Sequence, residues 1–101
     1  MPYQVLFSDI ARAQLRALGA RDRATLLGAV RKQLVYEPDE QTRNRKRMDP
    51  DKRMYVAPWE LRLGHLRVYY AVEEAALRVV ILKIGIKNRD RVITDEGPIE
   101  P

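Results

Sequence analysis

The chain has 101 residues, of which 46% are hydrophobic and 33% are charged, and its formal net charge is +5. This length suits a single domain, and the composition is typical of a folded globular protein rather than a disordered one. The absence of cysteine excludes disulfides and thiolate metal sites, and a single histidine, His65, argues against a histidine-based zinc site.

No stretch of the sequence approaches the run of apolar residues that a membrane span needs. The first residues also lack a charged start followed by an apolar run and a cleavage site, so we expect no signal peptide and a cytoplasmic protein. Residues 3–7 (YQVLF) are short, apolar and rich in strand formers, which predicts a first strand.

Two helices are expected to follow this strand. Ser8 is typical of a helix N-cap, and residues 9–18 place apolar side chains on one face before Gly19. A second helix is expected from about residue 21 to residue 36, ending before Pro38. Its apolar face is predicted to contain Leu27, Val30 and Leu34. The short connection predicts that the two helices form an antiparallel hairpin.

The segment 41–53 carries six basic residues against two acidic ones. The basic residues are Arg43, Arg45, Lys46, Arg47, Lys52 and Arg53. A cluster of this kind is typical of a surface that binds a polyanion such as RNA. A solvated loop, or a surface for an acidic protein, remains an alternative, because charge runs alone carry little information.

Three apolar segments, 57–63, 66–72 and 77–86, lie in series with short connections, which predicts an antiparallel meander. The sequence therefore predicts an α+β fold: an N-terminal strand and a helical hairpin packed on one face of a small antiparallel β-sheet. We expect residues 1–93 to form the domain and 94–101 to form a flexible C-terminal tail with at most one short turn of helix or strand.

The stretch WELRLGHLRVYY, residues 59–70, predicts a hairpin around Gly64 and His65, because glycine at the first position of a two-residue loop suits a type II′ turn. Strand alternation then places one set of residues on the core face. This set is Trp59, Leu61, Leu63, Leu66, Val68 and Tyr70. The opposite, solvated face pairs Arg62 with Arg67 and Glu60 with Tyr69.

Two like charges placed directly opposite destabilise a sheet. Arg62 and Arg67 therefore either await a phosphate, which guanidinium groups bind with a planar fork of donors, or form a plain solvated face with Glu60 as counter-ion. The last strand is expected to bring further residues toward this face and its end. These residues are Lys83, Gly85, Lys87, Arg89 and Arg91.

Three segments, YQVLFSDIARAQLRAL, WELRLGHLRVYYAV and VVILKIGIKNRDRVI, together resemble the RelE/ParE superfamily of bacterial toxins from Tyr3 to about Ile93. The resemblance implies two helices on an antiparallel sheet, no cofactor, no metal, and a cognate antitoxin as partner. RelE-like members cut mRNA on the ribosome without a metal, by attack of the 2′-hydroxyl on the scissile phosphate. ParE-like members instead inhibit DNA gyrase and are not nucleases.

The resemblance also implies roles for individual residues. Arg67 matches the arginine that contacts the scissile phosphate, Arg62 matches a supporting arginine, and Lys87 stands where the nuclease has a second phosphate-binding arginine. Besides Lys87, three positions depart from the RelE pattern. Ile93 replaces a tyrosine, and Pro58 and Glu60 replace lysines.

Glu60 is the candidate general base on the charged face, and Tyr69 is a candidate proton donor or base-stacking group. The alternative for Glu60 is that it is only a counter-ion, and the alternative for Tyr69 is that it is an ordinary strand residue. His65 is expected to lie in the turn, away from the cluster.

The leading hypothesis is a ribosome-dependent mRNA endonuclease; the alternatives are a gyrase inhibitor and an inactive antitoxin-binding relative. If the chain is a nuclease, the basic segment 41–53 would dock on RNA together with Lys83, Arg89 and Arg91. This binding should weaken as the salt concentration rises.

Overall fold

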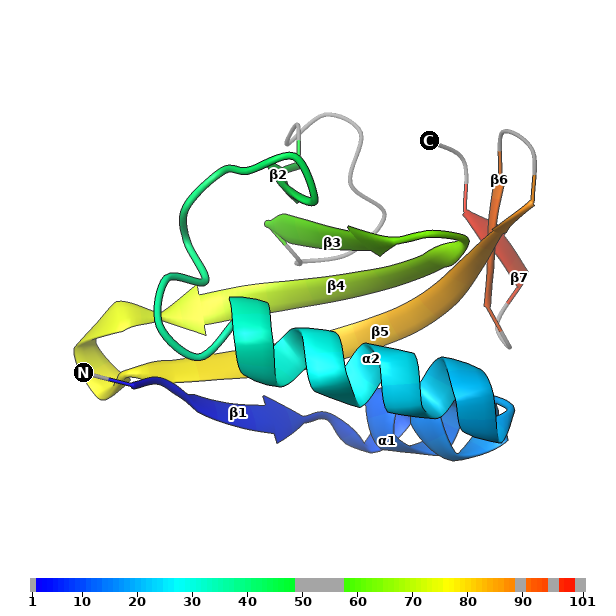
Figure 1. Cartoon of the computed structure of the whole chain (residues 1–101), viewed down its shortest axis with the longest axis horizontal. Helices are drawn as coiled ribbons and strands as arrows, with labels where there is room; N and C mark the ends of the chain where they lie inside the picture. The colour runs from blue at the N-terminus through cyan, green and yellow to red at the C-terminus, as the bar shows by residue number, and fades with distance from the viewer. Residues whose placement is uncertain (1, 49–57, 89–90, 95–96, 100–101) are drawn as a thin grey trace.

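The computed structural model describes residues 2–48, 58–88, 91–94 and 97–99, and its strands and two helices confirm the predicted α+β fold (Figure 1). The elements are, in chain order, β1 (Gln4–Phe7), α1 (Asp9–Ala17), α2 (Ala20–Gln33), β2 (Arg45–Arg47), β3 (Trp59–Leu63), β4 (Leu66–Glu73), a 3₁₀ turn (Glu74–Ala76), β5 (Arg78–Asn88), β6 (Arg91–Thr94) and β7 (Gly97–Ile99). Within the described residues, no helix is long and apolar enough to cross a bilayer.

The strands form one sheet in the order β2-β3-β4-β5-β6-β7. The predicted meander of β3, β4 and β5 is confirmed. β1 joins the same sheet parallel to the first half of β5, while β6 and β7 extend it beyond the second half (Figure 1). The parallel pairing of β1 was not predicted, because it joins strands that lie far apart in the sequence. The C-terminal residues thus contain two short strands, and the boundary at residue 94 stays a prediction.

The two helices begin where the sequence predicts. The Ser8 Oγ accepts a hydrogen bond from the Ala11 N–H at 3.1 Å, which confirms the N-cap of α1. α2 ends at Gln33, three residues earlier than predicted. Its buried apolar face carries Leu26 rather than Leu27, so the contacting positions are spaced four residues apart.

A β-bulge in β5 is tied to α1. The register between β4 and β5 shifts at Tyr69/Tyr70, so that β5 contains one extra residue at Leu82. The Ser8 hydroxyl donates to the Leu82 carbonyl at 3.0 Å, and the Gln14 Oε1 accepts from the Ile84 N–H at 2.7 Å. These bonds satisfy peptide groups beside the bulge. After the extra residue, Lys83 pairs with Tyr69 and lies on the sheet face opposite the helices.

The core lies between the helices and the sheet, and it contains the residues predicted for the inner face of the hairpin. Leu63 is the one partly buried member of that set. The rings of Trp59 and Tyr70 stack with centroids 6.1 Å apart, and the Tyr70 hydroxyl donates to the Pro38 carbonyl at 2.6 Å. Tyr70 therefore links β4 to the loop that follows α2.

Tyr70 gives the first testable prediction, a loss of stability in alkali. Burial raises the pKa of this phenol well above its ordinary value of 10.0; Arg45 lowers it in part and Asp39 raises it further. Above about pH 10 the unfolded phenol ionises while the folded one stays neutral, so the free energy of unfolding falls as pH rises. Tyr70→Phe should reduce that fall, and should cost about 0.5–1.5 kcal/mol near neutrality through the lost hydrogen bond.

Urea unfolding at neutral pH and at about pH 11 checks this prediction. Tyr36→Phe is the matched control, because Tyr36 is 66% exposed. If the wild type and Tyr70→Phe lost equal stability in alkali, Tyr70 would not be the group responsible.

Candidate functional site

The sheet face opposite the helices assembles the predicted site residues in cross-strand rows. One row, from β2 to β5, contains Lys46, Glu60, Tyr69 and Lys83. The next row contains Arg62, Arg67 and Gly85. Every predicted pair of the β3–β4 hairpin is confirmed. Gly64 has a φ of 60° and His65 has no positive φ, as a type II′ turn requires.

The prediction that this face is solvated is wrong for three of its side chains. Glu60 is 6% exposed, Arg67 is 8% exposed and Tyr69 is 2% exposed. Charged groups lie this deep only where hydrogen bonds or counter-charges satisfy them. The buried Tyr69 ring also does not present the open face that stacking on a nucleobase needs.

Glu60 and Arg62 satisfy each other. They lie two residues apart on β3 and therefore on the same face. The Arg62 Nε donates to the Glu60 Oε1 at 2.6 Å, and 45% of the Arg62 side chain is exposed against 8% of the Glu60 side chain. The pair thus has a covered carboxylate and an accessible guanidinium.

Arg67 is held by the backbone of its own hairpin. Its Nη1 donates to the Gly64 carbonyl at 2.6 Å and to the Leu66 carbonyl at 2.8 Å. The two guanidiniums of the Arg62–Arg67 pair are therefore bound to different acceptors. This division explains how the sheet tolerates two like charges in register.

His65 lies outside the charged cluster, as the turn predicted. Its Nε2 is 3.1 Å from the Asp22 Oδ2 in the first turn of α2. A shallow groove of about 480 Å³ surrounds this contact, between the hairpin turn and α2. The groove is lined by Arg21, Asp22, Thr25, Leu63, Gly64, His65 and Leu66. It contains none of the predicted catalytic residues, which lie on the sheet surface instead.

The predicted RNA-binding residues have different environments. Arg43, Lys46 and Arg47 are exposed, and the Arg47 guanidinium lies 5.5 Å from the centre of the Trp59 ring. Lys83 is half-buried and Lys87 is exposed near the hairpin turn, where its N–H donates to the His65 carbonyl. Three residues, Lys52, Arg53 and Arg89, lie outside the described residues. Arg91 begins β6, opposite Asn88.

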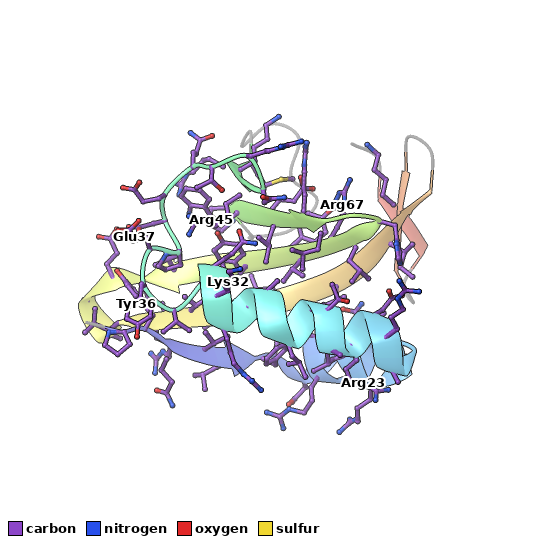
Figure 2. The ribbon with its side chains drawn as sticks, viewed as in Figure 1. Arg23, Lys32, Tyr36, Glu37, Arg45 and Arg67 are labelled. Carbon is purple, nitrogen blue, oxygen red and sulfur yellow. The ribbon has the colours of Figure 1, made fainter. Side chains whose placement is uncertain are left out.

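Arg45 does not fit its predicted role. It is 8% exposed, and its Nη1 donates to the Gln33 carbonyl at 2.6 Å and to the Glu37 carbonyl (Figure 2). A cation at the C-terminal end of a helix satisfies carbonyls that have no partner within the helix. Arg45 therefore fastens the end of α2 to the start of the sheet, and RNA cannot use the same donors.

This assignment predicts different results for two neighbouring residues. Arg45→Ala should lower the free energy of unfolding by about 1–3 kcal/mol, because the Gln33 and Glu37 carbonyls lose this donor. Lys46→Ala, at an exposed position, should change it by less than about 0.5 kcal/mol. Urea unfolding of both variants checks this; equal losses would contradict the structural role of Arg45.

Sequence reasoning missed two features of the site. The position of Lys46 opposite Glu60 depends on the register of β2, which a three-residue strand does not reveal. The contact of His65 with Asp22 joins segments far apart in the sequence and has no local signal. Among the residues that the structure describes, no group of three or more histidine, aspartate or glutamate side chains is placed to hold a metal ion.

No family model matches the sequence, and no curated protein sequence matches it. Several solved structures match the chain. The chain is 28% identical to a chain of the toxin–antitoxin complex RelBE2 from Mycobacterium tuberculosis, with a TM-score of 0.71 over 86% of this chain and 100% of that one.

Two further structures share the fold at 24% identity. The isolated Escherichia coli RelE toxin matches with a TM-score of 0.65 over 86% of both chains. The archaeal RelE–RelB complex from Pyrococcus horikoshii matches with a TM-score of 0.61 over 88% of this chain and 99% of the matched chain. The mycobacterial complex thus confirms the predicted likeness to the RelE superfamily of toxins, and the two 24% identical chains share its fold.

Proposed function

We propose that this chain is the toxin of a type II toxin–antitoxin pair and that it cuts mRNA on the ribosome without a metal. The observation that carries the proposal is the cluster of Glu60, Arg62 and Arg67 on one sheet face, flanked by lysines on both neighbouring strands. A carboxylate beside guanidinium groups supplies a proton acceptor and stabilisation for a phosphate that gains negative charge. The mycobacterial complex supports the toxin role.

In the proposed reaction, the Glu60 carboxylate takes the proton of the 2′-hydroxyl while the O2′ atom bonds to phosphorus. The bond from phosphorus to the O5′ of the next nucleotide then breaks, and that oxygen takes a proton from solvent, because the predicted proton donor Tyr69 is 2% exposed. The products are a 2′,3′-cyclic phosphate and a 5′-hydroxyl. Arg62, Arg67 and Lys87 stabilise the charge that develops on the phosphorus oxygens.

The basic surface would dock the toxin on RNA. Arg43, Lys46 and Arg47 are its exposed described residues, Lys83 and Arg91 lie on β5 and β6, and the sequence adds Lys52, Arg53 and Arg89. We propose that residues 1–93 form the working domain. An antitoxin with an acidic, amphipathic helix or strand would neutralise the toxin by covering the basic face and apolar surface. Exposed apolar side chains available to it are Leu6, Ile10, Tyr36 and Ile86.

Brief expression in cells tests the proposal against a gyrase inhibitor. New 5′ ends of mRNA should appear inside codons, and they should be lost in Arg67→Ala. Plasmid supercoiling, measured in the same cultures, should stay unchanged. Intact messages with poisoned gyrase would replace the nuclease by the gyrase inhibitor, and intact messages with normal supercoiling would leave an antitoxin-binding relative.

A further inference from the structure

We infer that the RNA phosphate takes Arg62 away from Glu60. The substrate would replace one anionic partner of this guanidinium by another, and the exchange would free the carboxylate to accept a proton. The inference rests on the proposed function for the role of Glu60, but the exchange itself is a binding event that can be measured without cleavage.

The geometry of the pair supports the exchange. The 2.6 Å contact between the Arg62 Nε and the Glu60 Oε1 is short for a hydrogen bond between N–H and oxygen, as expected between two charged groups. While this bond lasts, the Oε1 atom is occupied by a donor and the negative charge is stabilised. The carboxylate is then a poor acceptor for the proton of a hydroxyl group.

The two partners differ in access. Arg62 has 45% of its side chain exposed, whereas Glu60 has 8%, so a phosphate meets the guanidinium first. The pair uses the Nε–H, and a guanidinium has five N–H donors. A phosphate can bind two of them at once and outcompete the carboxylate. Arg67 is a weaker first contact, because it is 8% exposed and its Nη1 already serves two carbonyls.

Two other cations lie in the same cross-strand row as Glu60. Lys46 is opposite Glu60 in the β2–β3 register, and Lys83 lies beyond Tyr69 in the same row. Lys46 is exposed, and among the described residues no carboxylate lies within ion-pair distance of it. When Arg62 leaves Glu60, Lys46 is placed to bind a second phosphate oxygen.

Titration with inorganic phosphate, followed by NMR at the Arg62 Nε–H, tests the exchange. Glu60→Gln replaces a charged competitor by a neutral amide, so phosphate should bind Arg62 about five- to tenfold more tightly in this variant than in the wild type. Glu73→Gln is the matched control: it removes the same charge from the Glu73–Arg78 pair, whose shortest contact is 2.7 Å, and should leave phosphate binding at Arg62 unchanged.

A second measurement uses the wild type alone, in case Glu60→Gln fails to fold. The ¹³C resonance of the Glu60 carboxylate should move with the same midpoint as the Arg62 Nε–H. A carboxylate that does not respond, or a Glu60→Gln protein that binds phosphate no more tightly than the wild type, would overturn the exchange. A protein that shows the exchange but cuts no mRNA would instead contradict only the proposed function.

Discussion

Glu60→Gln should lower the rate of mRNA cleavage by about 100- to 10,000-fold, the range that a general base contributes. The amide has nearly the shape of the carboxylate and can still accept a hydrogen bond from Arg62, so the hairpin should stay folded. It cannot take the proton of a 2′-hydroxyl. The measurement is single-turnover cleavage of a message on purified ribosomes, with circular dichroism to verify that the variant is folded.

Glu73→Gln serves as the control for this variant, because it lies on the same sheet and loses the same charge without touching the cluster. Its cleavage rate should equal that of the wild type. A Glu60→Gln protein that is folded and cuts at the wild-type rate would exclude Glu60 as the base and leave it as the counter-ion of Arg62.

Arg67→Ala should have two large effects. Cleavage should fall by about 100- to 1,000-fold, as for the loss of one donor to a developing oxyanion. The free energy of unfolding should also fall by about 1–3 kcal/mol, because the Gly64 and Leu66 carbonyls lose their donor. Single-turnover cleavage and urea unfolding measure the two effects separately.

Arg67→Lys separates the two roles of this residue. Lysine keeps the charge and can donate to one carbonyl at a time, but it has no planar fork. We expect it to restore most of the stability and little of the activity. Full recovery of cleavage in Arg67→Lys would show that only the charge matters, and wild-type cleavage by folded Arg67→Ala would remove Arg67 from the mechanism.

The hairpin could be predicted in detail because the residues that fix its register are close together in the sequence. Alternation of apolar and polar residues on both sides of Gly64 allows only one register, since a slip of one residue would bury Arg62 and expose Leu61. The confirmed pairs of β3 and β4 follow from this pattern alone. The N-cap at Ser8 was predictable for the same reason.

The partners of the side chains could not be predicted. The register places Arg62 opposite Arg67, but it does not show that one binds a carboxylate and the other binds the turn. Arg45 was predicted to bind RNA like its basic neighbours. Its carbonyl acceptors lie in α2 and in the loop that follows α2, and the sequence around Arg45 does not reveal them. The bulge at Leu82 depends likewise on Ser8 and Gln14, which lie about 70 residues away in the sequence.

Incubation of the purified protein with ribosomes that carry a defined message tests the central claim most directly. We expect one cut within a codon, a 2′,3′-cyclic phosphate on the upstream product and a 5′-hydroxyl on the downstream product. We expect Glu60→Gln to form these products at the strongly reduced rate given above, and the wild-type protein to form none in the absence of ribosomes. An intact message after incubation with the folded wild-type protein, or products with a 5′-phosphate, would contradict this claim.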